Sequence, residues 1–369
     1  MDRAARAGQN EAQARIAARS LTAAAALRPS LFARRRSMSW LKRLRVDAFT
    51  LALLGAVALA WWFPLQGAAA RGLDDFTNIA IAALFFMHGA RLSREAIVAG
   101  ALHWRLHLVI FASTFILFPL LGLALKPLSG QWLTPELYLG LLFLCTLPST
   151  VQSSIAFTSM AGGNVPAAVC SASASSLLGV FLTPLLMSAL AGSHGAMANP
   201  GEAIGKIMLQ LLVPFVAGHL LRRWVGGWVE RRRAVLRYTD QGTVLLVVYT
   251  AFAASVSSGL WQSTPVQALY VVIGVCALLL AVVMAATTFA ARRLGFSRED
   301  EIAIVFCGSK KSLATGVPMA KILFASSALG AIVLPVMIFH QIQLIVCASI
   351  ARRYARRAAT APALEEAAD

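Results

Sequence analysis

The chain has 369 residues, of which 58% are apolar and 13% charged, and its mean hydropathy is +0.71. An average soluble domain has about 45–50% apolar and about 25% charged residues, so this composition excludes a soluble globular protein and predicts a bilayer as the solvent for much of the chain. The net charge of +17 would indicate nucleic acid as a partner of a soluble protein, but the basic residues lie between apolar runs, so we expect no nucleic-acid partner.

The first 37 residues differ from the rest of the chain, because they are rich in Arg and Ala and contain no apolar run of membrane-spanning length. We interpret residues 1–37 as a disordered or mis-called extension, with Met38 as the start of the folded chain. A transit peptide is the alternative that their composition allows.

Ten apolar segments follow, and each could cross the hydrocarbon core, which takes a helix of roughly 20 residues. In chain order they are 46–63, 73–92, 104–125, 136–160, 165–191, 203–221, 238–260, 264–291, 300–323 and 326–351. Basic residues gather in alternate connections, notably 222–237 and 352–357, which the positive-inside rule places in the cytoplasm. The sequence therefore predicts an all-α integral membrane protein with ten transmembrane helices. Both termini are then cytoplasmic, and the expected location is the plasma membrane, which is the inner membrane of a bacterium.

A short repeat relates the fifth segment to the tenth. The stretch SSLLGVFLTP at Ser175–Pro184 recurs as SSALGAIVLP at Ser326–Pro335, which is the pairing that a duplicated unit of five helices requires. Because five is odd, the second copy enters the membrane from the opposite side, as in transporters built from inverted repeats. We therefore expect a first five-helix repeat at 38–195, an inverted second repeat at 196–354 and a cytoplasmic tail at 355–369.

The fourth and ninth segments are interrupted at matching places in the two repeats. Pro148 and a run of Ser, Thr and Gln break the fourth, and polar residues from Gly308 to Pro318 break the ninth. Proline lacks a backbone donor, and freed backbone groups survive in a membrane only inside protein or beside a wet cavity. Paired broken helices are the best sequence indication of a substrate site near the middle of the membrane. The alternative is a pair of proline kinks repaired by hydroxyl groups.

Lys310 and Lys311 lie in the middle of the ninth segment, where a charged side chain costs roughly 2.5–3.5 kcal/mol on the insertion scale. Four roles remain open for this pair: support of the crossing through water or backbone carbonyls, binding of an anion, replacement of a bound sodium ion, and proton transfer. We expect Lys310→Gln to abolish anion binding while stabilising the protein, because it removes a buried charge, and Lys311→Gln to have a smaller effect.

We predict that polar residues around the two interruptions line a substrate or ion site. They are Ser149, Thr150, Gln152, Ser153, Ser154, Ser173, Ser309, Lys310, Lys311 and Ser312. Close helix packing is the alternative role of the serines. His88 and His340 are candidate proton relays, and hydrogen-bonded core residues otherwise. The five cysteines lack metal-ligand spacing and no HExxH or GxSxG motif occurs, so we expect neither a metal site nor an enzyme.

The order of these features resembles the bile acid:sodium symporter family over essentially all of Met38–Tyr354. Pro148–Ser154 reads PSTVQSS where the family has Pro-Gly-Gly-x-x-Ser-Asn, and the family's Pro-x-x-x-Gly appears at Pro214–Gly218. The stretches FFMHGARLSREAI, FTSMAGGNV, LLVVYTAF and FCGSKKSLA are similar to the branch of symporters related to solute carrier family 10 member seven. The resemblance implies a panel domain and a core domain, with broken helices 4 and 9 crossing in the core.

The resemblance also implies a secondary transporter that moves a small organic anion or amphipath together with sodium. However, sodium-coupled members have Glu-x-Gly-x-Gln-Asn, with Glu and Gln as sodium ligands, where this chain has FCGSKK at Phe306–Lys311. The sixteen acidic residues lie in loops, tails or the ends of segments, so two ammonium groups would repel a sodium ion there without a compensating carboxylate.

Two alternatives follow from this departure. One is a proton-coupled or uncoupled anion carrier in which lysine replaces sodium. The other is a membrane regulator of ion homeostasis that does not transport. Beyond Na+ or H+ as a coupling ion we expect no cofactor, and the expected partners are the organic anion and the lipid bilayer.

Overall fold

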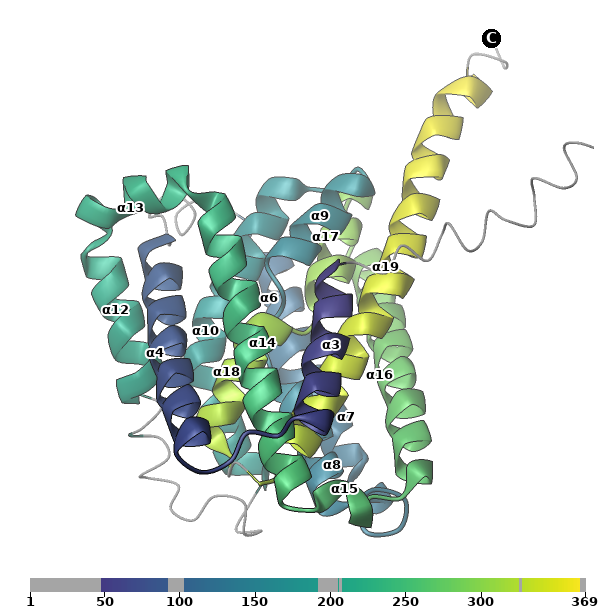
Figure 1. Ribbon diagram of the computed structural model, residues 1–369. Helices are drawn as coiled ribbons and strands as arrows, with labels where there is room; N and C mark the ends of the chain where they lie inside the picture. The colour runs from purple at the N-terminus through teal and green to yellow at the C-terminus, as the bar shows by residue number, and fades with distance from the viewer. Residues whose placement is uncertain (1–47, 92–102, 192–204, 206–207, 325–326, 366–369) are drawn as a thin grey trace, which may run out of the picture. The chain divides into compact units, whose positions relative to one another are not determined.

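The computed structural model describes residues 48–91, 103–191, 205, 208–324 and 327–365 (Figure 1). Contacts between Cα atoms divide the chain into two units, Met1–Leu51 and Ala52–Asp369. The first unit contributes only the first turn of α3 (Ala48–Trp62) to the described residues, so the helix packing belongs to the second unit. The regular elements in the described part of the chain are all helices, which confirms the predicted all-α class.

Each of the ten predicted segments contains at least one helix. After α3, the first half contains α4 (Gly67–Arg91), α6 (Trp104–Ala112), η2 (Ser113–Leu117), α7 (Phe118–Ala124), η3 (Lys126–Leu128), α8 (Pro135–Thr146), α9 (Gln152–Met160) and α10 (Val165–Ala191). The second half contains η4 (Met208–Leu212), α12 (Val213–Leu220), α13 (Arg222–Arg231), α14 (Arg233–Ser257), α15 (Leu260–Ser263), α16 (Val266–Arg293), α17 (Arg298–Gly308), α18 (Leu313–Leu323) and α19 (Leu329–Glu365).

Four of the described helical stretches are long and apolar enough to cross a membrane by length and composition. They are Trp104–Leu128, Val165–Ala191, Val266–Arg293 and Leu329–Arg356. Shorter apolar helices are found at Ala48–Trp62, Pro135–Thr146 and Leu209–Leu220. These helices agree with an integral membrane protein, while the arrangement of ten spans as two inverted repeats stays a prediction.

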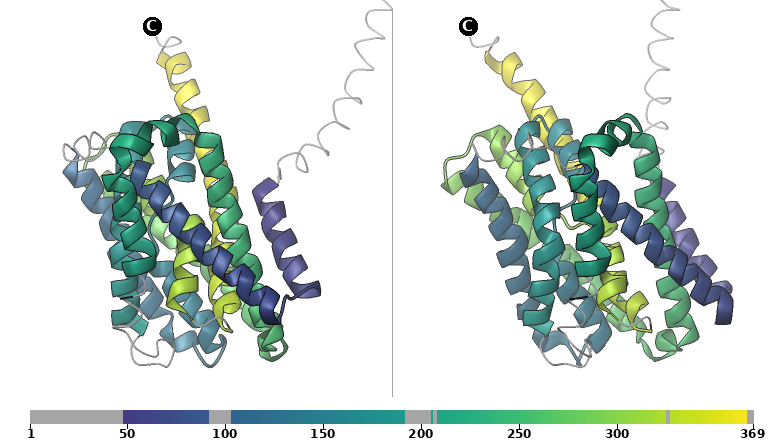
Figure 2. Two further views of the ribbon diagram at one scale, coloured as in Figure 1. Left: turned by 60° about the vertical axis from the view of Figure 1, so that its left-hand side comes forward. Right: turned by 90° about the vertical axis from the view of Figure 1, so that its left-hand side faces the viewer.

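The helices of the second unit pack in two groups. In one group α4 packs against α12, α13 and α14, and Figure 2 shows α4 running obliquely past α12 and α14. In the other group α17 packs against α6, α9, α10 and α16, and α19 packs against α8, α9, α16 and α18. Helix α14 connects the groups, because it also contacts α18 and α19.

Two glycines allow α4 and α12 to cross in backbone contact. A Cβ atom added at Gly89 of α4 would overlap the carbonyl oxygen of Phe215, and one added at Gly218 of α12 would overlap that of Phe86. Small residues at such crossings let helix backbones approach closely in a membrane. Gly218 ends the Pro-x-x-x-Gly pattern of the sequence, and the crossing gives that pattern a packing role.

The third predicted segment is not a uniform α-helix, because one π-helical turn, η2, lies between α6 and α7. The N–H of Phe118 donates to the carbonyl of Ser113, five residues earlier, instead of the carbonyl four residues earlier. The next residue is Pro119, which has no N–H to continue the ladder. π-helical turns inside helices are frequent at functional sites, and this turn lies beside the interruption of the ninth segment, as its contacts with Lys311 show.

Candidate substrate site at the helix crossing

The two interrupted segments meet where their helices end. The fourth segment leaves helical conformation between α8 and α9, and the ninth between α17 and α18, so both predicted breaks are confirmed. The second break is shorter than predicted, because Gly316 and Pro318 lie inside α18. The N–H of Ser312 in the second break donates to the carbonyl of Pro148 in the first, at 2.9 Å. This hydrogen bond joins the two breaks directly, although the residues are far apart in the sequence.

Serine hydroxyls satisfy the carbonyl groups that the end of α17 leaves without helical donors. Ser149 Oγ donates to the carbonyl of Cys307 at 2.6 Å, and Ser154 Oγ donates to that of Phe306 at 3.0 Å. Ser113 Oγ of the π-helical turn donates to the carbonyl of Gly308 at 2.9 Å. Ser149 and Ser154 were predicted to line a site, and the structure engages their hydroxyls in holding the crossing together.

Lys311 is 1% exposed and its ammonium group is saturated by backbone carbonyls. Nζ donates to the carbonyls of Thr114 at 2.9 Å, Cys145 at 2.9 Å and Leu147 at 2.7 Å. The ammonium also lies 4.1 Å from the centre of the Phe118 ring. An ammonium has three N–H donors, so all three are used and this side chain has none left for a ligand.

Lys310 is equally buried but has a different environment. It is 0% exposed, and among the described residues Nζ makes one hydrogen bond, to the carbonyl of Ser153 at 2.8 Å. Two aromatic faces cover the ammonium, with ring centres 3.9 Å away for Phe157 and 5.5 Å away for Phe306. Within the described part of the chain, two of its three N–H donors have no acceptor and are available to a bound molecule.

Gln343 of α19 binds the backbone of Lys311 with both ends of its amide group. The N–H of Lys311 donates to Gln343 Oε1 at 3.0 Å, and Gln343 Nε2 donates to the carbonyl of Lys311 at 3.0 Å. His340 Nδ1 lies 3.0 Å from the same Nε2, so this candidate relay is joined to the crossing through Gln343. Gln343 is completely buried.

Replacing Gln343 with leucine should lower the free energy of unfolding by about 2–4 kcal/mol, because two buried backbone groups lose their partners and each costs about 1–3 kcal/mol. Denaturation of the purified full-length protein in detergent measures this change. Gln267→Leu at an exposed position near the start of α16 is the matched control and should change stability by less than about 0.5 kcal/mol. Equal stability of the two variants would contradict the proposed role of the amide.

The other predicted site residues are dispersed around the crossing. Thr150 Oγ1 lies 2.6 Å from Ser153 Oγ, and Gln152, the first residue of α9, is exposed. Ser312 caps α18, since its hydroxyl accepts a hydrogen bond from the N–H of Thr315 at 3.3 Å.

Ser309, Ser173 and the candidate relay His88 complete the predicted positions. Ser309 Oγ donates to the carbonyl of Val305 at 2.6 Å, and Ser173 is half-buried on α10. His88 belongs to the α4 group, where its Nε2 lies 3.8 Å from Asp240 Oδ1 of α14. None of these contacts tests binding, so the lining residues stay a prediction.

Sequence reasoning missed several groups at the crossing. Gln343, Ser113 and Thr114 take part in it, and their only signal is a polar side chain within an apolar run. The hydroxyls of Thr158 in α9 and Thr315 in α18 are buried and have no hydrogen-bond partner among the described residues. Buried hydroxyls without partners are unusual, and these two indicate acceptors or donors left for a bound molecule.

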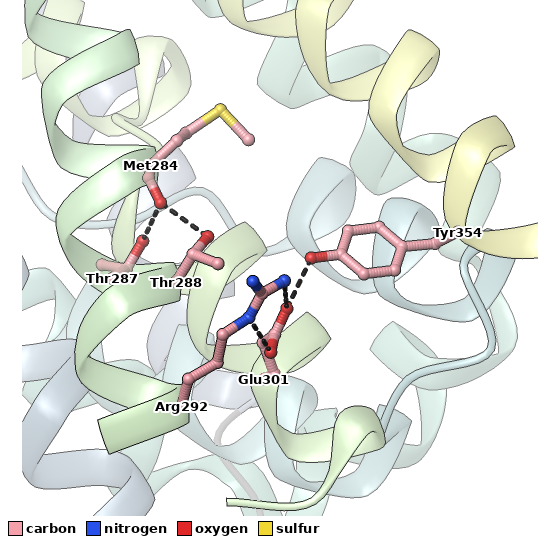
Figure 3. A network of polar contacts seen from close by, with 6 residues as sticks. All are labelled: Met284, Thr287, Thr288, Arg292, Glu301 and Tyr354. Atoms are coloured by element: carbon pink, nitrogen blue, oxygen red, sulfur yellow. Dashed lines mark hydrogen bonds and ion pairs between the residues drawn. The ribbon is translucent and has the colours of Figure 1, made fainter. Parts of the chain in front are cut away.

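A second polar network fixes the start of α17 (Figure 3). Arg292 at the end of α16 binds the Glu301 carboxylate with two nitrogens, at 2.9 and 3.2 Å, and Tyr354 of α19 donates its hydroxyl to the same carboxylate at 2.8 Å. Figure 3 shows the three side chains converging from three helices. Glu301 lies at the end of a predicted segment, as the sequence indicated for the acidic residues.

Two interrupted helices that meet inside an apolar helical protein are the arrangement of secondary transporters. Comparison with known proteins agrees with this class. Residues 47–356 match the sequence model of the SBF-like CPA transporter family, and the chain belongs to this family. The predicted resemblance is thereby confirmed, and the protein is an integral membrane transporter and not an enzyme.

Relatives from bacteria and vertebrates share most of their length with this chain. An uncharacterized protein of Pseudomonas aeruginosa, PA2026, is 66% identical over 84% of this chain and 93% of its own length. The "Putative symporter YfeH" of Escherichia coli K12 is 56% identical over 87% of this chain and 96% of its own. Sodium/bile acid cotransporter 7 of Xenopus tropicalis is 30% identical over 84% of this chain and 92% of its own.

Proposed function

We propose that this transporter moves a small organic anion and that Lys310 holds the anionic group of the substrate at the helix crossing. The observation that carries the proposal is the buried ammonium of Lys310, which makes one hydrogen bond to the residues that the structure describes. A charge in the middle of a membrane protein is costly and marks a functional site by default. An anion that accepts the two remaining N–H donors would compensate that cost.

Two further features favour an anion at this place. Helices α9 and α18 both begin at the breaks, and the N-terminal end of a helix attracts negative charge through its free N–H groups. Thr315, in the first turn of α18, has a buried hydroxyl without a partner among the described residues. The name of the cotransporter 7 relatives specifies bile acid, an amphipathic organic anion, which supports the same class of substrate.

The test is ligand binding and uptake with the purified full-length protein. A panel of anions that includes taurocholate and dicarboxylates is screened by thermal shift, and uptake of the stabilising anion is measured in proteoliposomes. Lys310→Met should reduce anion binding by about 10–100-fold, since a hydrogen bond to a charged group is worth about 1.5–3 kcal/mol. The matched control is Lys321→Met, which removes a half-buried lysine, 2.6 Å from Asp74, at the far end of α18.

The outcomes separate the candidate functions. Retention of anion binding by Lys310→Met would contradict the proposed site. Absence of flux for each anion that binds the wild type would favour a regulator that does not transport. Of these two functions, membership in a transporter family supports anion transport.

We further propose ten spans in two inverted repeats, both termini in the cytoplasm and insertion in the plasma membrane. The alternation of basic connections supports this topology. Reporter fusions after residues 130 and 260 should then report the outside, and those after residues 228 and 296 the cytoplasm. A reversal between neighbouring fusion sites would contradict the ten-span topology.

A further inference from the structure

We infer that the crossing contains a site for a monovalent cation, built from backbone carbonyls, which the protein fills permanently with the ammonium group of Lys311. The site itself rests on carbonyl geometry alone. Its consequence, transport that does not require sodium at this position, rests on the proposed function. Lys310 and Lys311 then have separate tasks, because Lys310 faces the substrate and Lys311 takes the place of an ion.

The first carbonyl of the site is freed by the π-helical turn. In a regular helix the carbonyl of Thr114 would accept from the N–H of Phe118, but that N–H is bonded to Ser113. The next N–H along the chain would belong to Pro119, which has none. The carbonyl of Thr114 therefore has no donor in its own helix, and Lys311 Nζ lies 2.9 Å away.

The second and third carbonyls are freed by the end of α8. The carbonyl of Cys145 would accept from the N–H of Ser149, which instead donates to Ser175 Oγ at 3.0 Å, and the intervening Pro148 has no N–H. Leu147 is extended, with ψ of 151°, so its carbonyl turns away from the helix. Both oxygens accept from Lys311 Nζ.

The three carbonyl oxygens, of Thr114, Cys145 and Leu147, form a cage around the Lys311 ammonium that suits a cation with a single charge. Carbonyl oxygens replace the hydration shell of an alkali ion in selective sites, and the C-terminal end of a helix such as α8 carries partial negative charge. Among the described residues, no carboxylate lies within ion-pair distance of the Lys311 ammonium. A cage of neutral oxygens without a carboxylate does not offset the desolvation of a divalent ion, whereas one ammonium with three donors matches three acceptors.

The experiment empties the site and offers cations to it. Thermal stability of the full-length protein is measured in sodium, potassium, methylammonium and choline chloride at constant ionic strength. Lys311→Ala removes the ammonium and leaves its volume open, whereas Lys311→Met removes the charge and fills the volume. Lys310→Ala is the matched control, because it opens an equal volume beside a single carbonyl.

The wild type should have the same melting temperature in all four salts. Lys311→Ala should melt several degrees higher in methylammonium or sodium than in choline, with a saturable dependence on concentration. Lys311→Met and Lys310→Ala should not distinguish the salts. A sodium-dependent rise in the melting temperature of the wild type would overturn the inference, and so would equal behaviour of Lys311→Ala in all four salts.

A second pair of variants tests the site if Lys311→Ala does not fold. Pro119→Ala restores an N–H beside the Thr114 carbonyl, so it should raise the melting temperature of Lys311→Met while leaving the wild type unchanged or less stable. No difference between Lys311→Met and the double variant would overturn the inference. These readouts need no substrate. If Lys310→Met bound anions as the wild type does while cations still stabilised Lys311→Ala, the proposed function would be rejected and the cation site would stand.

Discussion

Replacing Lys311 with methionine should lower the free energy of unfolding by about 3–5 kcal/mol, comparable with breaking a buried charged pair. Three backbone carbonyls would lose their donor, and an unsatisfied buried group costs about 1–3 kcal/mol. The gain from not burying an ammonium offsets part of this loss. Denaturation of the purified full-length protein measures the change.

Lys310→Met is the matched comparison, because it removes the same charge from the adjacent position but frees only the carbonyl of Ser153. We expect this variant to be at least as stable as the wild type. The sequence alone led us to expect a smaller effect of Lys311→Gln than of Lys310→Gln on anion binding, and that stays a prediction. For stability, the three hydrogen bonds of the Lys311 ammonium predict the larger effect at Lys311. Equal loss of stability in the two variants would show that the three carbonyls do not depend on Lys311.

Gly89→Ala should destabilise the pair of helices α4 and α12 by about 2–4 kcal/mol, at the upper end of overpacking costs. The new Cβ would overlap the carbonyl oxygen of Phe215, which is backbone and cannot rotate away, so the helices must separate. Gly218→Ala should behave in the same way against Phe86. Resistance of the full-length protein to thermal denaturation measures both effects.

Gly72→Ala provides the control on the same helix. A Cβ atom there would meet nothing within 4 Å, and alanine is favoured over glycine in a helix by about 1 kcal/mol. This variant should therefore be as stable as the wild type or more stable. If Gly89→Ala were also neutral, α4 and α12 would not be in backbone contact in the membrane.

The places where the fourth and ninth helices break could be predicted from the sequence, because a missing proline donor and a run of polar residues are local properties. Pro148 and the residues from Gly308 onward were sufficient for this. The partners of the freed carbonyls could not be predicted in this way. Ser113 donates to the carbonyl of Gly308, which lies 195 residues later in the sequence. No local sequence pattern predicts a contact between residues so far apart in the chain.

For the two lysines, the sequence predicted that they matter but not what each of them does. Their position in an apolar run identified them as important, but four roles remained open for the pair as a whole. The difference between them depends on the direction of each side chain at a non-helical turn, and neighbouring residues there diverge. Gln343, which fixes the Lys311 backbone from α19, was missed because one amide in an apolar helix is not distinctive.

The contacts of Glu301 constrain how a transport cycle would move this protein. The carboxylate ties α17 to both α16 and α19 through Arg292 and Tyr354, so these three helices should travel as one rigid body. Hinge motion is then confined to other boundaries, such as the contacts of α14 with α18 and α19. Spin labels placed on α16 and α19 should keep a constant separation in every transport state, while labels on α14 and α17 should report the motion.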